Sequence, residues 1–177
     1  MPRRPIDQLQ AGRAYYARHL PSVDQDHFGV LWHLFTVGHL VTIDLDALAR
    51  QSGYSFADLD LLGTLGVDES AGMRATDLAS ALYVSNAVVS KRVARLERDG
   101  LITRRKDAAD GRGYLLALTE QGRRLTEAAI ARLAHEAKIV RFFRKLEPQD
   151  QRSLVRILGD LHERFDREFV GGTYWDS

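Results

Sequence analysis

The 177-residue sequence predicts a mainly α-helical protein with one small β-hairpin. Over most of its length, apolar residues recur at intervals of three or four, which is the spacing of amphipathic helices. Residues 101–118 break this pattern, because two short runs rich in apolar residues flank a polar segment that contains two glycines. Two short helical segments, separated by a tight turn, come directly before this hairpin. The expected fold is therefore a winged helix-turn-helix domain flanked on both sides by longer helices.

Two helices are expected before the winged unit. The first is predicted over residues 6–20, and the second over residues 27–50 with Asp24 or Asp26 as its N-terminal cap. The centre of the second helix, residues 28–43, is apolar on nearly every side. A helix of this kind must be covered all round, so we expect it to lie between its own winged domain and a partner subunit. Its apolar centre is shorter than the roughly twenty residues that a membrane span needs, so no membrane contact is expected.

A third helix and the first helix of the helix-turn-helix come next. Ser55 is the expected cap of the third helix. The residues that this helix is predicted to bury are Phe56, Leu59, Leu61, Leu62 and Leu65. After a loop over residues 66–72, Thr76 is the expected cap of a short helix, and Tyr83 and Val84 form the turn. The apolar stripe of the short helix is predicted to be Leu78, Ala79 and Leu82.

The second helix of the motif is the expected recognition helix. Ser85 can cap its start, and Gly100 can end it as a left-handed glycine. The residues predicted to point inward are Val88, Val89, Val93 and Leu96. The residues predicted to face outward are Asn86, Ala87, Ser90, Lys91 and Arg95. A short helix with an apolar back and a small, polar and basic front fits the major groove of B-DNA.

The wing is predicted as a strand over residues 101–105, a polar tip over 106–113 and a returning strand over 114–118. Asp110 and Arg112 lie two positions apart in the tip, so their side chains leave an extended backbone on the same side. The carboxylate can hold the guanidinium in one rotamer, aimed at a phosphate or into a narrow minor groove. Asp110 is thus expected to orient Arg112.

Two long helices are expected after the wing. Thr119 is predicted to cap a helix that runs to about Leu146, and Pro148 is predicted to start the last helix. The recurring apolar residues of the first are Leu125, Ala129, Leu133, Ala137, Val140 and Phe143. Those of the second are Leu154, Ile157, Leu158, Leu161, Phe165 and Phe169. One winged module cannot cover this apolar surface, so a helical dimerisation domain and an intertwined homodimer are expected.

Charge and composition narrow the function classes. The net charge is only +1, yet residues 74–113 contain nine basic and five acidic residues, whereas residues 40–70 contain one and six. The positive charge is therefore concentrated on the predicted recognition helix and wing. No cysteine is present, which excludes disulfides, thiol redox sensing and cysteine-bound metal. The basic residues 1–4 are not followed by an apolar segment, so no signal peptide and a cytoplasmic location are expected.

Two runs of residues resemble a known family. Residues 110–122, DGRGYLLALTEQG, are similar to the signature of MarR-type transcriptional regulators, D-x-R-z-x-x-x-x-L-T-x-x-G, where z is Ser, Gly or another residue. Residues 96–105, LERDGLITRR, resemble the family's L-E-x-x-G-L-z-x-R, where z is Ile or Val. Gly113 is a departure, because many members carry Ser there and the hydroxyl can bond a phosphate. The resemblance implies a winged-helix homodimer that represses transcription and releases its DNA when a small aromatic or anionic ligand binds.

A two-fold dimer would place two recognition helices in major grooves about one turn apart, roughly 10 bp, on a palindromic operator of double-stranded DNA. The expected contacts from the recognition helix are Ser85, Asn86, Ser90, Lys91 and Arg95. The wing is expected to contribute Arg112, oriented by Asp110, together with Arg105 or Lys106. Asn86 can pair with adenine and Lys91 can reach guanine, and the sequence leaves open which of them reads bases.

The resemblance also implies a ligand site. The candidate ligand-binding residues are Trp32, His33, Thr36, His39, Asp60 and Arg92. Asp60 and Arg92, with Arg104, resemble the charged residues of the family's urate-responsive branch, in which a Trp of an extra N-terminal helix completes the site. This chain has Tyr15 or Tyr16 instead. The alternative is that Trp32 belongs to the core and that the two histidines are interface residues.

Other classes of function have little support. No two of the six histidines lie three or four positions apart, so no metal site is expected. Asp58 and Asp60 diverge on a helix, and no phosphate-cradling loop or nucleophile motif is present, so neither an enzyme nor a cofactor is expected. The remaining alternative is a winged-helix dimerisation protein without a ligand response. The expected division is 1–54 for N-terminal dimerisation helices, 55–119 for the winged domain, 120–170 for C-terminal dimerisation helices and 171–177 for a flexible tail.

Overall fold

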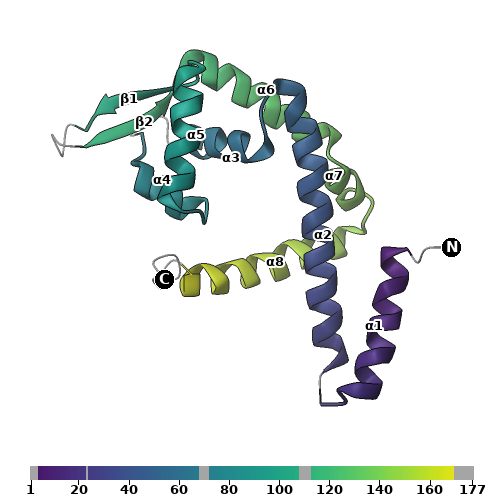
Figure 1. Cartoon of the computed structure of the whole chain (residues 1–177). Helices are drawn as coiled ribbons and strands as arrows, with labels where there is room; N and C mark the ends of the chain where they lie inside the picture. Colours follow the sequence, from purple (N-terminus) through teal and green to yellow (C-terminus); the bar gives the residue numbers. More distant parts are fainter. Residues whose placement is uncertain (1–3, 23, 68–71, 108–112, 170–177) are drawn as a thin grey trace. The chain divides into compact units, whose positions relative to one another are not determined.

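The computed structural model describes residues 4–22, 24–67, 72–107 and 113–169. Its elements are α1 (Pro5–His19), α2 (Gln25–Ala49), η1 (Arg50–Ser52), α3 (Phe56–Val67), α4 (Ala75–Ala81), α5 (Asn86–Arg98), β1 (Ile102–Lys106), β2 (Tyr114–Leu118), α6 (Glu120–Glu136), α7 (Lys138–Phe143) and α8 (Pro148–Phe169) (Figure 1). The predicted mainly helical fold with a small β-wing is confirmed. The chain forms two compact units, residues 1–44 and 45–177, and each is described by itself.

The first unit contains α1 and most of α2. Of the two expected caps for α2, Asp24 is the one that acts, because its Oδ1 accepts hydrogen bonds from the backbone N–H groups of Asp26 (2.8 Å) and His27 (3.4 Å). The two helices approach closely at Gly12, where a Cβ would lie 2.9 Å from the ring of Phe28. A larger residue at position 12 would therefore require the Phe28 ring to move.

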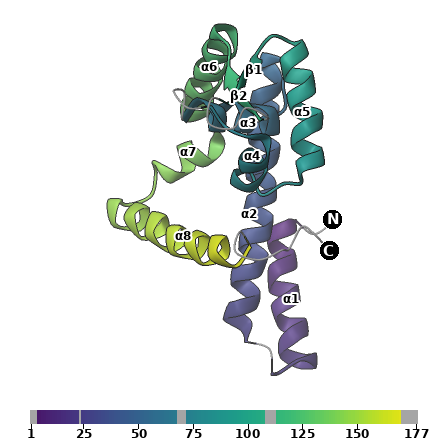
Figure 2. The same ribbon diagram turned by 90° about the vertical axis from the view of Figure 1, so that its left-hand side faces the viewer.

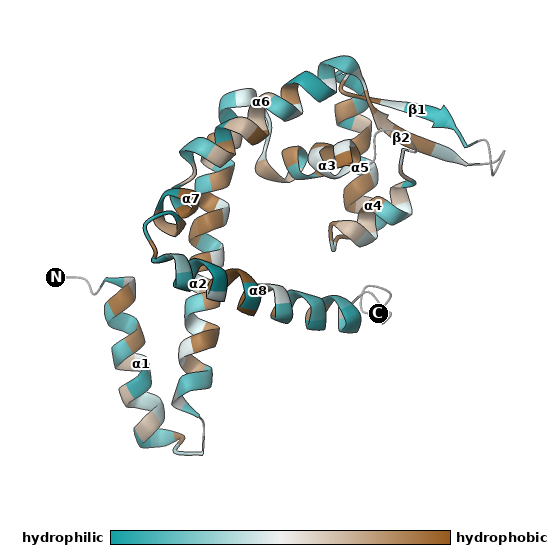
Figure 3. Cartoon of the chain, turned by 180° about the vertical axis from the view of Figure 1, so that it is seen from behind, coloured by the Kyte–Doolittle hydropathy of each residue, from teal (hydrophilic) through white to brown (hydrophobic). Residues whose placement is uncertain are grey.

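α2 carries a large apolar surface that the single chain leaves exposed. Phe35 is 79% exposed and Leu31 is 68% exposed. Hydrophobic residues follow most of the helix in Figure 3. The continuous helical segment Asp26–Ser52 has 27 residues and a mean hydropathy of 1.4, so by length and composition alone it could cross a membrane. The shortness of the apolar centre therefore does not by itself decide the role of this helix.

The core of the second unit is built around α3. Leu61 and Leu62 are fully buried, and Leu59 and Leu65 are nearly so, as the sequence predicts, whereas Phe56 is only partly buried. Ser55 caps the helix as expected: its Oγ accepts a hydrogen bond from the N–H of Asp58 at 3.2 Å. The N–H of Ser55 donates in return to the carboxylate of Asp58 at 2.9 Å, which completes a reciprocal capping box.

The helix-turn-helix consists of α4 and α5. The prediction that Thr76 caps α4 is wrong. The cap position is Arg74, two residues earlier, and its side chain makes no capping hydrogen bond. The Thr76 hydroxyl instead donates to the carboxylate of Asp77 at 3.2 Å. Tyr83 has a φ of +51° in the turn, and Ser85 caps α5 by accepting a hydrogen bond from the N–H of Val88 at 3.4 Å.

α5 ends as predicted at Gly100, whose φ is +74°. The N–H of Leu101 bonds the carbonyl of Leu96 at 2.9 Å, and the N–H of Gly100 bonds that of Glu97 at 3.0 Å. These two bonds form a Schellman motif, and Leu96 and Leu101 are both fully buried. Leu101 is thus used by the helix end, which is why the first strand starts one residue later than expected.

β1 and β2 form an antiparallel hairpin whose register runs from the pair Ile102 and Leu118 to the pair Lys106 and Tyr114. Figure 3 colours most of β1 hydrophilic and much of β2 hydrophobic, since one side of the hairpin meets the core. Met73 bonds Leu116 on the other edge of β2 through both backbone groups, at 3.0 and 2.8 Å. The predicted tip residues Asp110 and Arg112 lie outside the described residues.

The helix after the wing begins as predicted but ends earlier. Thr119 caps α6, because its Oγ1 accepts a hydrogen bond from the N–H of Gly122 at 3.0 Å. The expected continuous helix to about Leu146 is wrong, since Ala137 leaves the helical region with a ψ of 133°. Ala137 is only 1% exposed, and it both ends α6 and precedes α7. α8 then begins at Pro148, as predicted.

Candidate DNA-binding surface and adjacent groove

The outward face of α5 carries the small polar and basic side chains expected of a recognition helix. Asn86, Ser90 and Lys91 are exposed, and α5 runs beside the hairpin (Figure 1, Figure 2). Ser85 is also exposed, but its hydroxyl already accepts the capping bond. Arg105 and Lys106 are exposed on β1. Their roles in DNA binding stay predictions, as do those of Asp110 and Arg112.

The predicted inward face of α5 is wrong at one position. Val89 and Val93 are 0% and 2% exposed, whereas Val88 is 37% exposed. The buried stripe of α5 consists of Val89, Val93 and Leu96. Val88 precedes Val89 in the sequence, so its side chain leaves the helix on a different side and does not point into the core. It borders a groove instead.

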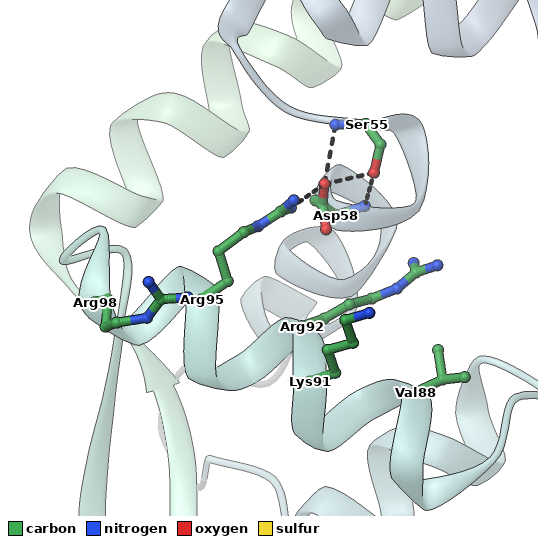
Figure 4. A pocket seen from close by; sticks show the side chains of 7 residues that line it. All are labelled: Ser55, Asp58, Val88, Lys91, Arg92, Arg95 and Arg98. Atoms are coloured by element: carbon green, nitrogen blue, oxygen red, sulfur yellow. Dashed lines mark hydrogen bonds and ion pairs between the residues drawn. The ribbon is translucent and has the colours of Figure 1, made fainter.

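Arg95 differs most from the expectation that it faces outward to DNA. Its guanidinium forms an ion pair with the carboxylate of Asp58 at the start of α3, as Figure 4 shows. The Asp58 side chain is 2% exposed, while that of Arg95 is 46% exposed. The Cζ of Arg95 also lies 6.0 Å from the ring centroid of Tyr54. The side chain that was expected to contact DNA thus joins two helices of the domain.

Two further ion pairs use basic residues of the winged domain internally. The Nε of Arg104 lies 3.1 Å from the carboxylate of Glu97, which connects β1 to α5. Arg74 lies 2.6 Å from Asp107, which connects the start of α4 to the end of β1. The excess of positive charge in the sequence therefore overstates the charge that is available to a partner. Among the exposed basic side chains, Lys91, Arg105 and Lys106 remain the best-placed candidates for DNA.

A groove of about 400 Å³ lies between the start of α3 and α5. Its lining residues are Ser55, Asp58, Val88, Lys91, Arg92, Arg95 and Arg98 (Figure 4). Four of these side chains are basic and one is acidic. Because the single carboxylate is already paired with Arg95, the groove presents a net positive charge that suits an anionic group.

The pKa values of Asp58 and Asp60 are shifted in opposite directions. Burial raises the pKa of Asp58, but hydrogen bonds from Ser55 and the ion pair with Arg95 outweigh burial, so its pKa lies below the ordinary value. Asp60 is an exposed residue whose carboxyl is partly desolvated; this desolvation raises its pKa, and the charge of Arg92 partly opposes the rise. The charge of Arg92 thus acts on Asp60, and the role of both residues in ligand binding stays a prediction.

The predicted ligand residues are divided between the two units. Asp60 and Arg92 belong to the second unit, and Arg92 lines the groove. The other four, Trp32, His33, Thr36 and His39, belong to the first unit. His33 and His39 are exposed, while Trp32 and Thr36 are half-buried. None of these ligand assignments is tested by the geometry of either unit.

Aromatic side chains form a row in the first unit. The ring of Trp32 lies 6.0 Å from that of Phe28, and Phe28 lies 4.7 Å from Tyr16, measured between centroids. Tyr15 continues the row, 5.7 Å from Tyr16 and 4.5 Å from His19. The Trp32 ring therefore lies beside Phe28, which itself contacts Tyr16 of α1.

The structural importance of Asp58 and Arg95 was missed in the sequence. The signal that could have found it is the spacing of Ser55 and Asp58, which is that of a capping box and fixes the carboxylate at the helix start. Nothing in the sequence spacing links this position to Arg95, which is 37 residues further along.

Among the residues that the structure describes, no group of three His, Asp or Glu side chains is placed to hold a metal ion.

Comparisons with known proteins agree with this geometry. The MarR family model matches residues 52–113, which run from η1 into the wing. The HTH-type transcriptional repressor YetL of Bacillus subtilis (strain 168) is 24% identical over 149 residues, which cover 84% of this chain and 88% of YetL. CouR from Rhodococcus jostii RHA1, in a crystal structure with p-coumaroyl-CoA, is 25% identical, with a TM-score of 0.67 over 77% of this chain and 91% of CouR. S. aureus MepR in complex with DNA has the same fold, with 22% identity and a TM-score of 0.67 over 76% of this chain and 94% of MepR.

Proposed function

Because the chain belongs to the MarR family of transcriptional regulators, we propose that it is a repressor that binds palindromic operator DNA as a homodimer and is released by a small aromatic or anionic ligand. The observation that carries this proposal is the exposed face of α5, formed by Asn86, Ser90 and Lys91, beside the hairpin. A capped helix with such a face can enter the major groove with its N-terminal residues against base edges.

Different parts of the winged domain would make different kinds of contact. Asn86 and Lys91 have the hydrogen-bonding groups that recognise adenine and guanine in the major groove. Arg105 and Lys106 project from β1, where a phosphate of the backbone would meet them. Arg112, which lies outside the described residues, keeps its predicted role at a phosphate or in the minor groove. The electrostatic contacts supply affinity, and the base contacts supply sequence preference.

The homodimer is supported by apolar surface that one chain leaves uncovered. On α2, Phe35 is 79% exposed, and on α8, Ile157 and Leu158 are 46% and 43% exposed. Large apolar side chains gathered on an exposed helix face are typical of protein–protein contacts. A second copy of the chain, related by a two-fold axis, would cover them and would place two α5 helices roughly 10 bp apart on the DNA.

The ligand part of the proposal rests on the groove between α3 and α5. Its volume of about 400 Å³ and its four basic side chains suit a small carboxylate or a phosphate-bearing compound. CouR, which has this fold, binds p-coumaroyl-CoA. Lys91 lies both on the outward face of α5 and in the groove lining, so an anion held there would compete with DNA for the same side chain.

The DNA part is tested by selecting bound fragments from sheared genomic DNA and measuring affinity for the best inverted repeat between 50 and 200 mM salt. If Lys91 contacts a phosphate or a base, Lys91→Ala should weaken binding and, for a phosphate contact, reduce the salt slope by about 1. Lys145→Ala, on an exposed lysine outside the winged domain, is the matched control. Failure of the wild-type protein to prefer any inverted repeat over random DNA would refute the proposal.

The ligand part is tested by thermal unfolding with a panel of aromatic carboxylates and acyl thioesters. A compound that binds the folded protein raises the midpoint according to RT ln(1 + [L]/Kd). The active compound should also lower operator affinity, and Arg92→Gln should reduce both effects. If no compound raises the midpoint at millimolar concentration, the dimerisation protein without a ligand response is the better account.

A further inference from the structure

We propose that Asp58 and Arg95 form a positioning pair that sets the orientation of the recognition helix, and that Arg95 is not a DNA contact. This inference rests on the proposed function, because it concerns how α5 is presented to an operator. It starts from the observation that the guanidinium of Arg95 is directed at a carboxylate that is 2% exposed (Figure 4).

The carboxylate of Asp58 is held by more than Arg95. It accepts a hydrogen bond from the backbone N–H of Ser55 at 2.9 Å and another from the Ser55 hydroxyl. As the third residue of α3, it also lies at the positive end of the helix dipole. A buried carboxylate with this many donors has a fixed direction, so it can define where the guanidinium must lie.

The segment that presents Asp58 is itself fixed to the end of α2. The Oδ1 of Asp46 accepts a hydrogen bond from the backbone N–H of Phe56 at 3.0 Å. The Oδ2 of Asp46 accepts one from Arg50 at 2.8 Å. These hydrogen bonds hold the start of α3 in place. The ion pair with Asp58 therefore ties Arg95, and with it α5, to a fixed point.

α5 needs such a directional contact. Val89, Val93 and Leu96 bury the back of the helix, but apolar contacts have no fixed direction and tolerate small rotations about the helix axis. The ion pair acts near the middle of the third turn, while Ser85 fixes the start of the helix and the Glu97–Arg104 pair fixes its end. The Asp58–Arg95 pair supplies the missing constraint between those ends.

A double-mutant cycle on full-length protein tests the proposal, using Asp58→Asn, Arg95→Gln and the double variant. Affinity for the selected operator is measured between 50 and 200 mM salt. Each single variant is expected to bind roughly three- to tenfold more weakly, with the double variant no weaker than either single one and all salt slopes unchanged. If Arg95→Gln instead reduces the salt slope by about 0.9, Arg95 contacts a phosphate and the proposal is overturned. The proposal is also overturned if Asp58→Asn leaves the affinity unchanged or raises it.

Asp77→Asn is the matched control, since it removes one negative charge from an exposed position of the same domain. Amide hydrogen exchange of α5 in the absence of DNA provides a second readout. Exchange should become faster in Asp58→Asn and Arg95→Gln and should stay unchanged in Asp77→Asn. Unchanged exchange in the first two variants overturns the positioning role even if the wild-type protein binds no operator, so the proposed function and this inference fail separately.

Discussion

The phenol of Tyr83 donates a hydrogen bond to Oδ1 of Asp166 at 2.6 Å, and its oxygen lies 3.1 Å from Nε2 of His162. Tyr83 occupies the left-handed turn between the two helices of the DNA-binding motif, with a φ of +51°. Asp166 and His162 belong to α8. One hydroxyl therefore connects the turn of the motif to the last helix.

This contact predicts a measurable change in the titration of Tyr83. The hydrogen bond to Asp166 raises the pKa of Tyr83 above 10.0, because the nearby carboxylate stabilises the protonated phenol. Asp166→Asn should lower that pKa toward 10, and ultraviolet absorbance titration of the phenolate should show the shift. Tyr83→Phe should remove the titration step that shifts, which assigns this step to Tyr83. Tyr114→Phe should leave the shifted step in place. The stability that the contact contributes is present below pH 10 and is lost as the pH rises through the raised pKa.

Local sequence signals predicted most of the fold correctly. Ser85 and Thr119 accept the expected capping bonds, Gly100 has the expected positive φ, and Pro148 begins α8. In each case the responsible chemistry lies within four residues of the position. These features depend on backbone groups that the residue itself satisfies or replaces, so they could be inferred without knowledge of the tertiary structure.

Features that depend on distant contacts could not be predicted in this way. The break at Ala137 has no glycine or proline to mark it, since the sequence continues the helical spacing. Arg95 reads as an outward basic residue because its partner, Asp58, belongs to another helix. Val88 belongs to the apolar set by residue type, yet the rotation of α5 leaves it on the groove.

The correction at Thr76 leads to a paired prediction on stability. Thr119→Ala removes a true cap, whose Oγ1 accepts from Gly122 and also donates to the carbonyl of Gly100 at 2.6 Å, and should cost about 1 kcal/mol or more. Thr76→Ala, within the first turn of α4, should change stability by less than about 0.5 kcal/mol. Urea unfolding monitored by circular dichroism measures both. Equal losses would restore Thr76 as a cap.

Gly122 allows α6 to pack against the backbone of Leu101, just before β1. A Cβ on this residue would lie 2.1 Å from the carbonyl oxygen of Leu101, so Gly122→Ala should force a backbone shift and cost about 3 kcal/mol. Gly63→Ala is the control, because its Cβ would meet only the Cδ1 of Ile130 at 3.9 Å, an ordinary contact. That variant should gain roughly 0.5–1 kcal/mol from helix propensity. Thermal and urea unfolding should separate the two alanines clearly, and similar midpoints would contradict the packing argument.

The lowered pKa of Asp58 predicts that the free energy of unfolding decreases at acidic pH. Because its pKa in the folded protein is below the ordinary value of 3.8, its contribution is present above that value and is lost as the pH falls through the lowered pKa. Asp58→Asn should therefore flatten the loss of stability between neutral and acidic pH. Asp60→Asn should act in the opposite sense, since the pKa of Asp60 is raised and its ionisation disfavours folding. Urea unfolding from pH 7 downward distinguishes the two, and parallel curves for both variants would contradict these directions.

α8 offers the sharpest test of the proposed homodimer. Its apolar stripe consists of Leu154, Ile157, Leu158, Leu161 and Phe165. Ile157→Glu places a charge in the middle of this stripe, and burying that charge against a second copy should weaken dimerisation by tenfold or more, because about 1.4 kcal/mol already gives a factor of ten. Val155→Glu introduces the same residue on the helix surface beside the stripe, at a side chain that is 61% exposed. This variant should leave the dimer intact. Sedimentation velocity at micromolar concentration measures both, with circular dichroism as the check on folding. A folded wild-type protein that sediments as a monomer, or two glutamate variants that dissociate equally, would rule out this face as the contact between copies.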